Sequence, residues 1–257
     1  MLGDDLATFR FAGGDWRVGV TGGYLHDSFR LSQLASSGSV ESILGGVYMG
    51  VNFGNLRLNA GALYGTNTNA TTRTVNIGDV AFAHFGGETW AAFGQAGYRF
   101  TFSQPSLNAF GISVANVEPF IGAAAIDVRS STANEEGSTA ALTGFGKSFV
   151  VDSTTLGART ALAFTFTPDL PIFFNGALGW QHAFGNLSPT TLAAVQGNLQ
   201  STSVVSGGVP IARNALVTQV GLNYRVKPTI KVGVTYTGQY SGHAYDNAFN
   251  ANLHIDF

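Results

Sequence analysis

Hydrophobic and polar positions alternate along the last eleven residues of the chain. Phe249, Leu253, Ile255 and Phe257 fall on one face, and the intervening positions are mostly Asn, His and Asp. Because successive side chains of a strand point to opposite sides, this segment predicts a strand with one apolar and one polar face. A terminal strand of this kind, ending on an aromatic residue, is expected where the last strand closes an outer-membrane barrel.

The same period of two recurs through the rest of the chain. A match to the alternating template predicts an all-β, antiparallel fold of the transmembrane β-barrel type, with about eleven strands. The expected strands cover residues 6–12, 15–27, 42–53, 56–64, 90–102, 116–129, 156–166, 172–184, 216–226, 230–240 and 247–257.

The polar face of these strands differs from that of a soluble β-sandwich. It carries mostly Gly, Ser, Thr, Asn and Gln with an occasional Arg, whereas a water-exposed sheet is usually rich in Lys and Glu. We therefore expect this face to line a narrow wet lumen, with Glu118 also turned inward. These lumen-facing residues either line a path for a polypeptide or fill the interior with salt bridges and hydrogen bonds. They are Arg17, Arg57, Gln95, Arg99, Arg159, Gln219 and Arg225.

Aromatic residues lie near the ends of the predicted strands. Trp and Tyr gather at membrane–water interfaces, where barrels carry aromatic girdles. The residues predicted to form these girdles are Trp16, Tyr64, Trp90, Phe102, Trp180, Phe184, Tyr224 and Tyr240.

The connections between the predicted strands alternate in length. Long ones cover residues 28–39, 67–87, 130–153 and 186–213, and the others are short except for 104–115. Short periplasmic turns and long extracellular loops are typical of outer-membrane barrels. Single-chain bacterial barrels have an even number of strands. A count of eleven strands therefore predicts that one more strand precedes Met1. The alternative is a missed strand within 130–153 or 104–115.

Composition narrows the choice further. Charged residues make up 11% of the chain, against about 25% in a typical soluble domain. The chain contains no run of 18 apolar residues, so the sequence predicts no membrane-spanning helix. The absence of cysteine excludes disulfides, and a net charge of −2 gives no reason to expect a nucleic-acid partner.

Catalytic and metal-binding patterns are missing from the sequence. The five histidines are scattered without metal-ligand spacing, and no Gly-x-Ser-x-Gly motif presents a nucleophile. We therefore predict a chain that is not an enzyme and has no catalytic residue, metal site or cofactor.

Six short segments resemble the translocator domain of autotransporters, the type V secretion family. They occur in the family's order and cover nearly the whole chain. The match runs from the second strand of the family's domain to the end of that domain. They read FAGGDWRVGV at 11–20, AGYRF at 96–100, VEPFIG at 117–122, LGAR at 156–159, GWQHAFG at 179–185 and GVPIARNAL at 208–216. The family's first strand, its pore-threading linker helix and any passenger have no counterpart here, and Asn214 replaces the usual acidic residue.

This resemblance implies a function and a location. Residues 1–257 would form a single, N-terminally truncated barrel domain in the outer membrane of a Gram-negative bacterium. There it would contact lipid and anchor its own passenger, which is absent here, supporting export to the cell surface. The barrel-assembly machinery would read Phe249, Leu253, Ile255 and Phe257 as an assembly signal; alternatively, these residues only face lipid.

Two other classes of protein remain open at this stage. A stand-alone porin would need a complete barrel with an open lumen. An adhesin-like barrel would bind a partner through long loops such as 67–87 and 186–213, which are rich in Thr, Asn and Ser. The sequence upstream of the first strand discriminates these classes, because an autotransporter carries a passenger there.

Overall fold

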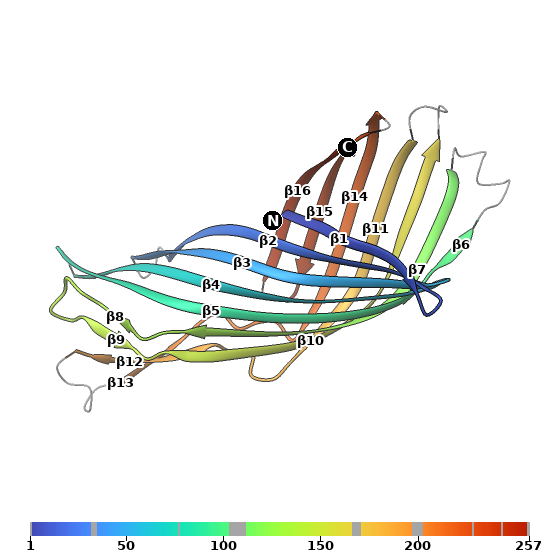
Figure 1. Cartoon of the computed structure of the whole chain (residues 1–257). Helices are drawn as coiled ribbons and strands as arrows, with labels where there is room; N and C mark the ends of the chain where they lie inside the picture. The colour runs from blue at the N-terminus through green and yellow to red at the C-terminus, as the bar shows by residue number, and fades with distance from the viewer. Residues whose placement is uncertain are drawn as a thin grey trace.

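The chain folds into one large antiparallel sheet and one small one. The computed structural model describes residues 2–31, 35–76, 78–102, 112–165, 171–196, 203–227, 229–242 and 244–255. The large sheet runs in chain order through eleven long strands (Figure 1). They are β1 (Leu2–Phe11), β2 (Gly14–Leu31), β3 (Ser36–Phe53), β4 (Leu56–Asn76), β5 (Asp79–Tyr98), β7 (Ile112–Ser130), β10 (Lys147–Thr165), β11 (Pro171–Phe184), β14 (Asn214–Lys227), β15 (Ile230–Tyr240) and β16 (Tyr245–Ile255).

The strand count agrees with the eleven alternating segments of the sequence. The short strand β6 (Phe100–Phe102) follows β5 after Arg99 and pairs with β7, so it continues the fifth predicted strand. Every neighbouring pair is antiparallel, so the predicted all-β, antiparallel fold is confirmed. Among the described residues, no helix is long and apolar enough to cross a membrane.

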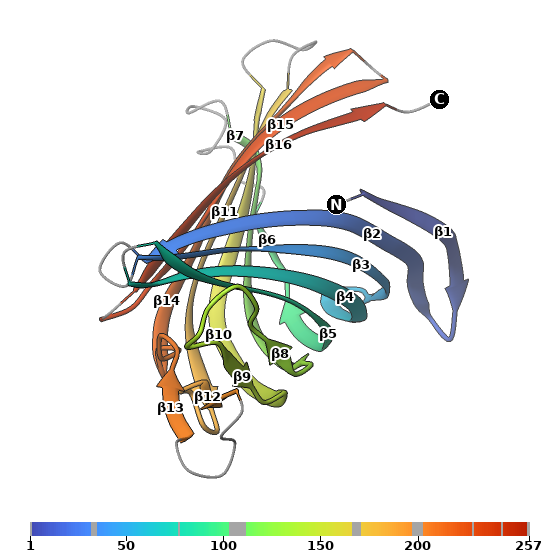
Figure 2. The same ribbon diagram turned by 90° about the vertical axis from the view of Figure 1, so that its left-hand side faces the viewer.

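The large sheet is strongly curled, so its two faces differ (Figure 2). Large apolar side chains cover the outer face and are more than half exposed, as they would be against lipid. Examples, with their exposed fractions, are Ile43 68%, Val47 57%, Ile121 57%, Leu156 60%, Leu178 57% and Val234 56%. On the concave face, side chains converge, and residues two strands apart touch each other. Gln239 of β15, for example, donates a hydrogen bond to Gln181 of β11 at 2.8 Å.

Within the described residues, β1 and β16 form the two edges of the sheet and do not pair with each other. Strand direction explains this opening. In an antiparallel order of eleven strands, the first and the last run the same way. They therefore cannot close an all-antiparallel barrel without a further strand between them, in agreement with the even strand numbers of bacterial barrels.

The predicted long loops are largely strand, which corrects the sequence prediction. Residues 28–31 and 36–39 extend the β2–β3 hairpin, and most of 67–87 extends the β4–β5 hairpin. We call this end of the sheet the long-connection end and the opposite end the short-turn end. The remaining two connections contribute the small sheet, which is ordered β13-β12-β9-β8 and lies below the β4–β5 extension, at the long-connection end, in Figure 1. Its strands are β8 (Ala133–Asn134), β9 (Leu142–Gly144), β12 (Thr190–Val195) and β13 (Ser203–Gly207).

The chemistry of the two faces reverses in the hairpin extensions. On the outer face of β4, Tyr64 is followed by Thr66 and Thr68, so this face becomes polar beyond the aromatic residue. On the concave face of β2, Leu25 and Phe29 share a side with Arg17, so large apolar side chains appear on this face, with Asp27 between them. The reversal is expected where strands leave the bilayer, because their outer face then meets water.

The small sheet is attached to the tip of the β4–β5 hairpin. Phe82 and Glu136 form an isolated antiparallel bridge, with backbone bonds of 3.0 and 2.8 Å. Arg73 donates two hydrogen bonds to the Glu135 carboxylate, at 3.0 and 2.5 Å. The alternative of a missed barrel strand within 130–153 is therefore wrong for the residues described, because β8 and β9 belong to the small sheet.

Candidate functional site

The predicted lumen-facing residues share the concave face of the large sheet. Directly paired residues of neighbouring strands point to the same side. Pairing places Arg17 opposite Gly50, Gly50 opposite Asn59, and Asn59 opposite Gln95. Continuing across the sheet in the same way also places Arg57, Arg99, Arg159, Gln219 and Arg225 on this face.

A buried glutamate brings three of these arginines together. Glu118 of β7 is only 2% exposed. The Arg99 Nε donates a hydrogen bond to Glu118 Oε2 at 3.2 Å, and the Arg159 Nε lies 3.3 Å from Glu118 Oε1. Arg57 reaches over from β4, with its Nη1 3.6 Å from Glu118 Oε2. We call these four residues the Glu118 cluster.

Two glycines make room for the Glu118 cluster. Gly97 of β5 lies between Arg57 and Glu118, and a Cβ there would stand 2.7 Å from Glu118 Oε1. The missing side chain therefore lets the carboxylate lie over the strand and reach Arg57. At Gly157, a Cβ would stand 2.8 Å from the ring of Phe120. That ring in turn lies under Arg159, whose Cζ is 4.5 Å from the ring centroid, a cation–π contact.

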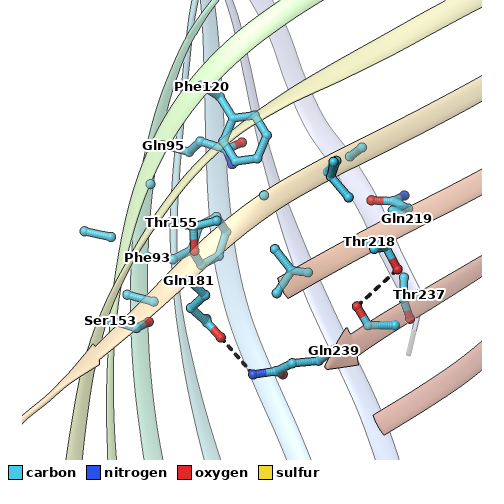
Figure 3. Close-up of a pocket in the computed structure, with 18 of the residues that line it drawn as sticks. Phe93, Gln95, Phe120, Ser153, Thr155, Gln181, Thr218, Gln219, Thr237 and Gln239 are labelled. Carbon is cyan, nitrogen blue, oxygen red and sulfur yellow. Dashed lines mark hydrogen bonds between the residues drawn. The ribbon is translucent and has the colours of Figure 1, made fainter. Parts of the chain in front are cut away.

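Beside the cluster lies a hollow on the concave face. One cavity of about 340 Å³ is lined by Arg57, Arg99, Glu118 and Arg159 together with amide side chains such as Asn175. A second, of about 500 Å³, lies next to it and is shown in Figure 3. Glutamine and threonine side chains point into this second cavity, and Gln95 lines both. Gln95 also accepts a hydrogen bond from the Arg159 Nη2, so the two cavities share a polar wall.

The other two predicted arginines lie apart from the cluster. Arg17 pairs with Asp5 of β1, with its Nε 3.3 Å from the carboxylate, and both side chains are well exposed. Arg225 lies directly opposite Lys231, and its buried Nε has no hydrogen-bond partner in the described part of the chain. Gln219 lines both cavities.

The predicted girdle residues lie at both ends of the outer face. Trp16, Phe102 and Tyr224 are near the short-turn end. Near the long-connection end, the rings of Tyr64 and Trp90 are 4.4 Å apart. Trp180, Phe184 and Tyr240 lie at that same end.

The predicted assembly signal is only partly described. Phe249 and Leu253 of β16 point outward and are 76% and 63% exposed. Ile255 is the last residue of β16 and pairs with Ile230. Phe257 lies outside the described residues.

A second ionic cluster, not expected from the sequence, lies outside the membrane-spanning part. Its centre is the pair of Arg73 and Glu135, and the Leu142 N–H also donates to the Glu135 carboxylate at 2.8 Å. Burial acts to raise the pKa of Glu135, but the bonds from Arg73 and Leu142 outweigh it and hold this pKa below its ordinary value. The pKa of Arg73 is raised, chiefly by the bonds to Glu135. Sixty-two positions separate the partners, and no local pattern signals such a pair.

The sequence indicated an inward Glu118 but missed Gly97 and Phe120, which shape its surroundings. An alternating template scores small and apolar residues on a polar face as neutral, so it carries no such signal. In the described part of the chain, no group of three or more His, Asp or Glu side chains is arranged to hold a metal ion.

Known proteins with the same architecture are found among autotransporters. The transport unit of AIDA-I from Escherichia coli aligns with 99% of this chain and 80% of its own at a TM-score of 0.66 and 17% identity. The translocator domain of NalP from Neisseria meningitidis gives a TM-score of 0.70 at 13% identity, over 99% of this chain and 79% of its own. The β-domain of the Bordetella autotransporter Brka gives a TM-score of 0.64 at 16% identity, over 99% of this chain and 88% of its own. These likenesses show the fold.

Sequence similarity shows the family of the chain in addition to its fold. Two extracellular serine proteases of Serratia marcescens are 30% and 31% identical, over 98% and 93% of this chain. The chain spans only 23% and 22% of the length of these relatives. The family described as Autotransporter beta-domain matches residues 1–237. Its members are outer-membrane barrels, and the translocator domain is not itself catalytic. The chain therefore belongs to the autotransporter β-domain family.

Proposed function

We propose that this chain anchors a passenger polypeptide in the outer membrane and supports its export to the cell surface. The observation that carries the proposal is the contrast between the two faces of one curled sheet. The outer face is apolar over the membrane-spanning part, whereas the concave face carries charged and amide groups suited to a wet interior. Family membership and the greater length of the relatives both support a passenger joined to this domain.

A twelfth strand would complete the barrel. In the part of the chain that the structure describes, β1 and β16 run in the same direction and each has one unpaired edge, so a single strand antiparallel to both could pair with the two edges. Closure would satisfy the backbone N–H and C=O groups of both edges, as a bilayer requires. We propose that the polypeptide upstream of residue 1 supplies this strand, and that residues 1–257 are the remainder of one barrel domain.

The chain would contact lipid through its outer face and the barrel-assembly machinery through its last strand. The eight girdle residues lie toward both ends of the outer face, where Trp, Tyr and Phe favour the membrane interfaces. Phe249, Leu253, Ile255 and Phe257 form the proposed assembly signal. The chain itself would perform no catalysis.

A surface-display assay tests the export function. A reporter passenger, joined through the natural upstream sequence, is expressed in a Gram-negative host, and its exposure is measured with protease added to intact cells. We expect the reporter to be cleaved from outside only when the barrel domain is present. If the barrel inserts while the reporter stays inside, the export function is wrong and a porin or an adhesin-like barrel becomes the better assignment.

Two leucine substitutions separate the assembly signal from simple lipid contact. Leu253 in β16 and Leu222 in β14 both face outward and are 63% and 54% exposed. We expect Leu253→Ala to reduce insertion in cells much more than Leu222→Ala, although both refolded variants lose similar stability in detergent. Equal insertion of the two variants in cells would exclude a recognition role for Leu253.

A further inference from the structure

The Glu118 cluster has more positive than negative charge. Three guanidinium groups face one carboxylate, so two positive charges have no counter-ion within the cluster. The charged groups that act on Arg57 are Arg99, Arg159 and Arg17, which repel it, and Glu118, which attracts it. No second carboxylate acts on Arg57 from the described part of the chain.

Of the three arginines in the Glu118 cluster, Arg57 has the weakest bonding to other residues. Its nearest contact to Glu118 is 3.6 Å, which is beyond hydrogen-bond length, and it makes no hydrogen bond with any described residue. Arg99 and Arg159, in contrast, each donate to a neighbouring side chain. A guanidinium carries five N–H donors in a planar fork that matches the two oxygens of a carboxylate. Arg57 therefore retains most of its donors for a ligand.

The space beside Arg57 suits such a ligand. The cavity of about 340 Å³ is lined by all three arginines of the cluster and by amide side chains such as Asn116 and Asn175. The side chain of Arg57 is 33% exposed, so a group entering from the lumen can reach it. Charge interactions are stronger in this partly buried position than in bulk water.

We propose that Arg57, with Arg99 and Arg159, forms a carboxylate-binding site whose ligand is an acidic side chain of a polypeptide lying in the lumen. The site rests on the proposed function in one respect: export supplies the polypeptide. The incoming carboxylate neutralises one of the two uncompensated charges and forms a fork-shaped pair with Arg57. Free small anions offer the same chemistry and are the other possible source of the ligand.

Calorimetric titration of the full chain in detergent micelles tests the site. The probes are three octapeptides of alternating Gly-Glu, Gly-Lys and Gly-Gln, each with blocked ends, and sodium acetate. We expect the Gly-Glu peptide to bind, the other two to bind at least tenfold more weakly, and added sodium chloride to weaken the Gly-Glu complex. Arg57→Gln should weaken Gly-Glu binding at least tenfold. The matched control Arg30→Gln, which removes an exposed arginine of β2, should leave it unchanged.

Several outcomes would overturn the proposal. Equal affinity for the Gly-Glu and Gly-Lys peptides, or unchanged affinity in Arg57→Gln, excludes a carboxylate site at Arg57. Acetate binding as tightly as the Gly-Glu peptide assigns the site to small anions and removes the polypeptide ligand. If Arg57→Gln does not fold, Arg57→Lys replaces it, because lysine keeps the charge but loses the fork and should still weaken binding. Peptide binding and surface display are separate measurements, so either proposal can fail alone.

Discussion

Replacing Glu118 by glutamine tests the central role of this carboxylate in the concave face. The amide keeps the size and one acceptor oxygen of the side chain but removes its negative charge. Three guanidinium groups then face one another without their shared counter-ion. We expect Glu118→Gln to lower the free energy of unfolding.

The structure sets the size of this effect. Removing one partner of a fully buried ion pair costs about 3–5 kcal/mol, and an exposed pair contributes about 1 kcal/mol or less. The side chain of Glu118 is only 3% exposed, but those of its three arginine partners are 31–33% exposed. Water therefore screens part of the repulsion, and we expect a loss of about 2–3 kcal/mol.

Urea unfolding in detergent micelles measures this loss through tryptophan fluorescence, checked by electrophoretic mobility with and without heating. The matched control is Glu41→Gln, because Glu41 is exposed on the outer face of β3 and, among the described residues, its ionic contact is His26 alone, at 3.5 Å. The control should change stability by less than about 0.5 kcal/mol. Equal stability of the two variants would refute the idea that the cluster depends on the Glu118 charge.

Three further predictions concern other contacts. Gly97→Ala should destabilise the chain by about 1–3 kcal/mol in the same urea assay because its Cβ would meet Glu118, whereas Gly94→Ala, whose Cβ meets nothing within 4 Å, should not. The protection of the β9 amides against hydrogen exchange, taken relative to the intrinsic rate at each pH, should stay high above the ordinary glutamate pKa of about 4.3. It should be lost as pH falls through the lowered pKa of Glu135, because protonation removes the charged pair with Arg73. Low protection at neutral pH in the wild type would contradict this, and Arg73→Gln should show low protection at every pH. Tyr64→Leu should lose about 1 kcal/mol through its contact with Trp90, and a loss equal to that of Ile43→Leu would exclude a specific ring contact.

The sequence was sufficient for the strands inside the membrane and insufficient for their extensions. In the membrane-spanning part of each strand, apolar residues alternate with polar ones, and the apolar residues face outward. The polarity of a residue such as Val47 or Arg57 therefore predicts which face of the sheet it occupies. Beyond Tyr64, the period continues but the chemistry reverses, and Thr66 and Phe29 no longer fit the template. The extensions were therefore predicted to be loops.

The charged cluster was predictable only in part. Inward arginines follow from alternation, because each occupies a polar position of its own strand. Their meeting at Glu118 depends on strand register and curvature, which bring β4, β5 and β7 side chains together across Gly97. The pair of Arg73 and Glu135 depends on a connection folding back over a hairpin, and no periodicity encodes that.

The reversal of the two faces constrains how this protein can be redesigned. Strands β2 to β5 continue into their hairpin extensions without a break, so each extension inherits its facing from the rest of its strand, residue by residue. Inserting a single residue at Gly65 would move every side chain of the β4 extension, from Thr66 onward, to the opposite face of the sheet. Inserting two residues would shift these side chains along the strand but keep each on its own face. Grafts onto this end of the molecule should therefore add residues to each strand in even numbers.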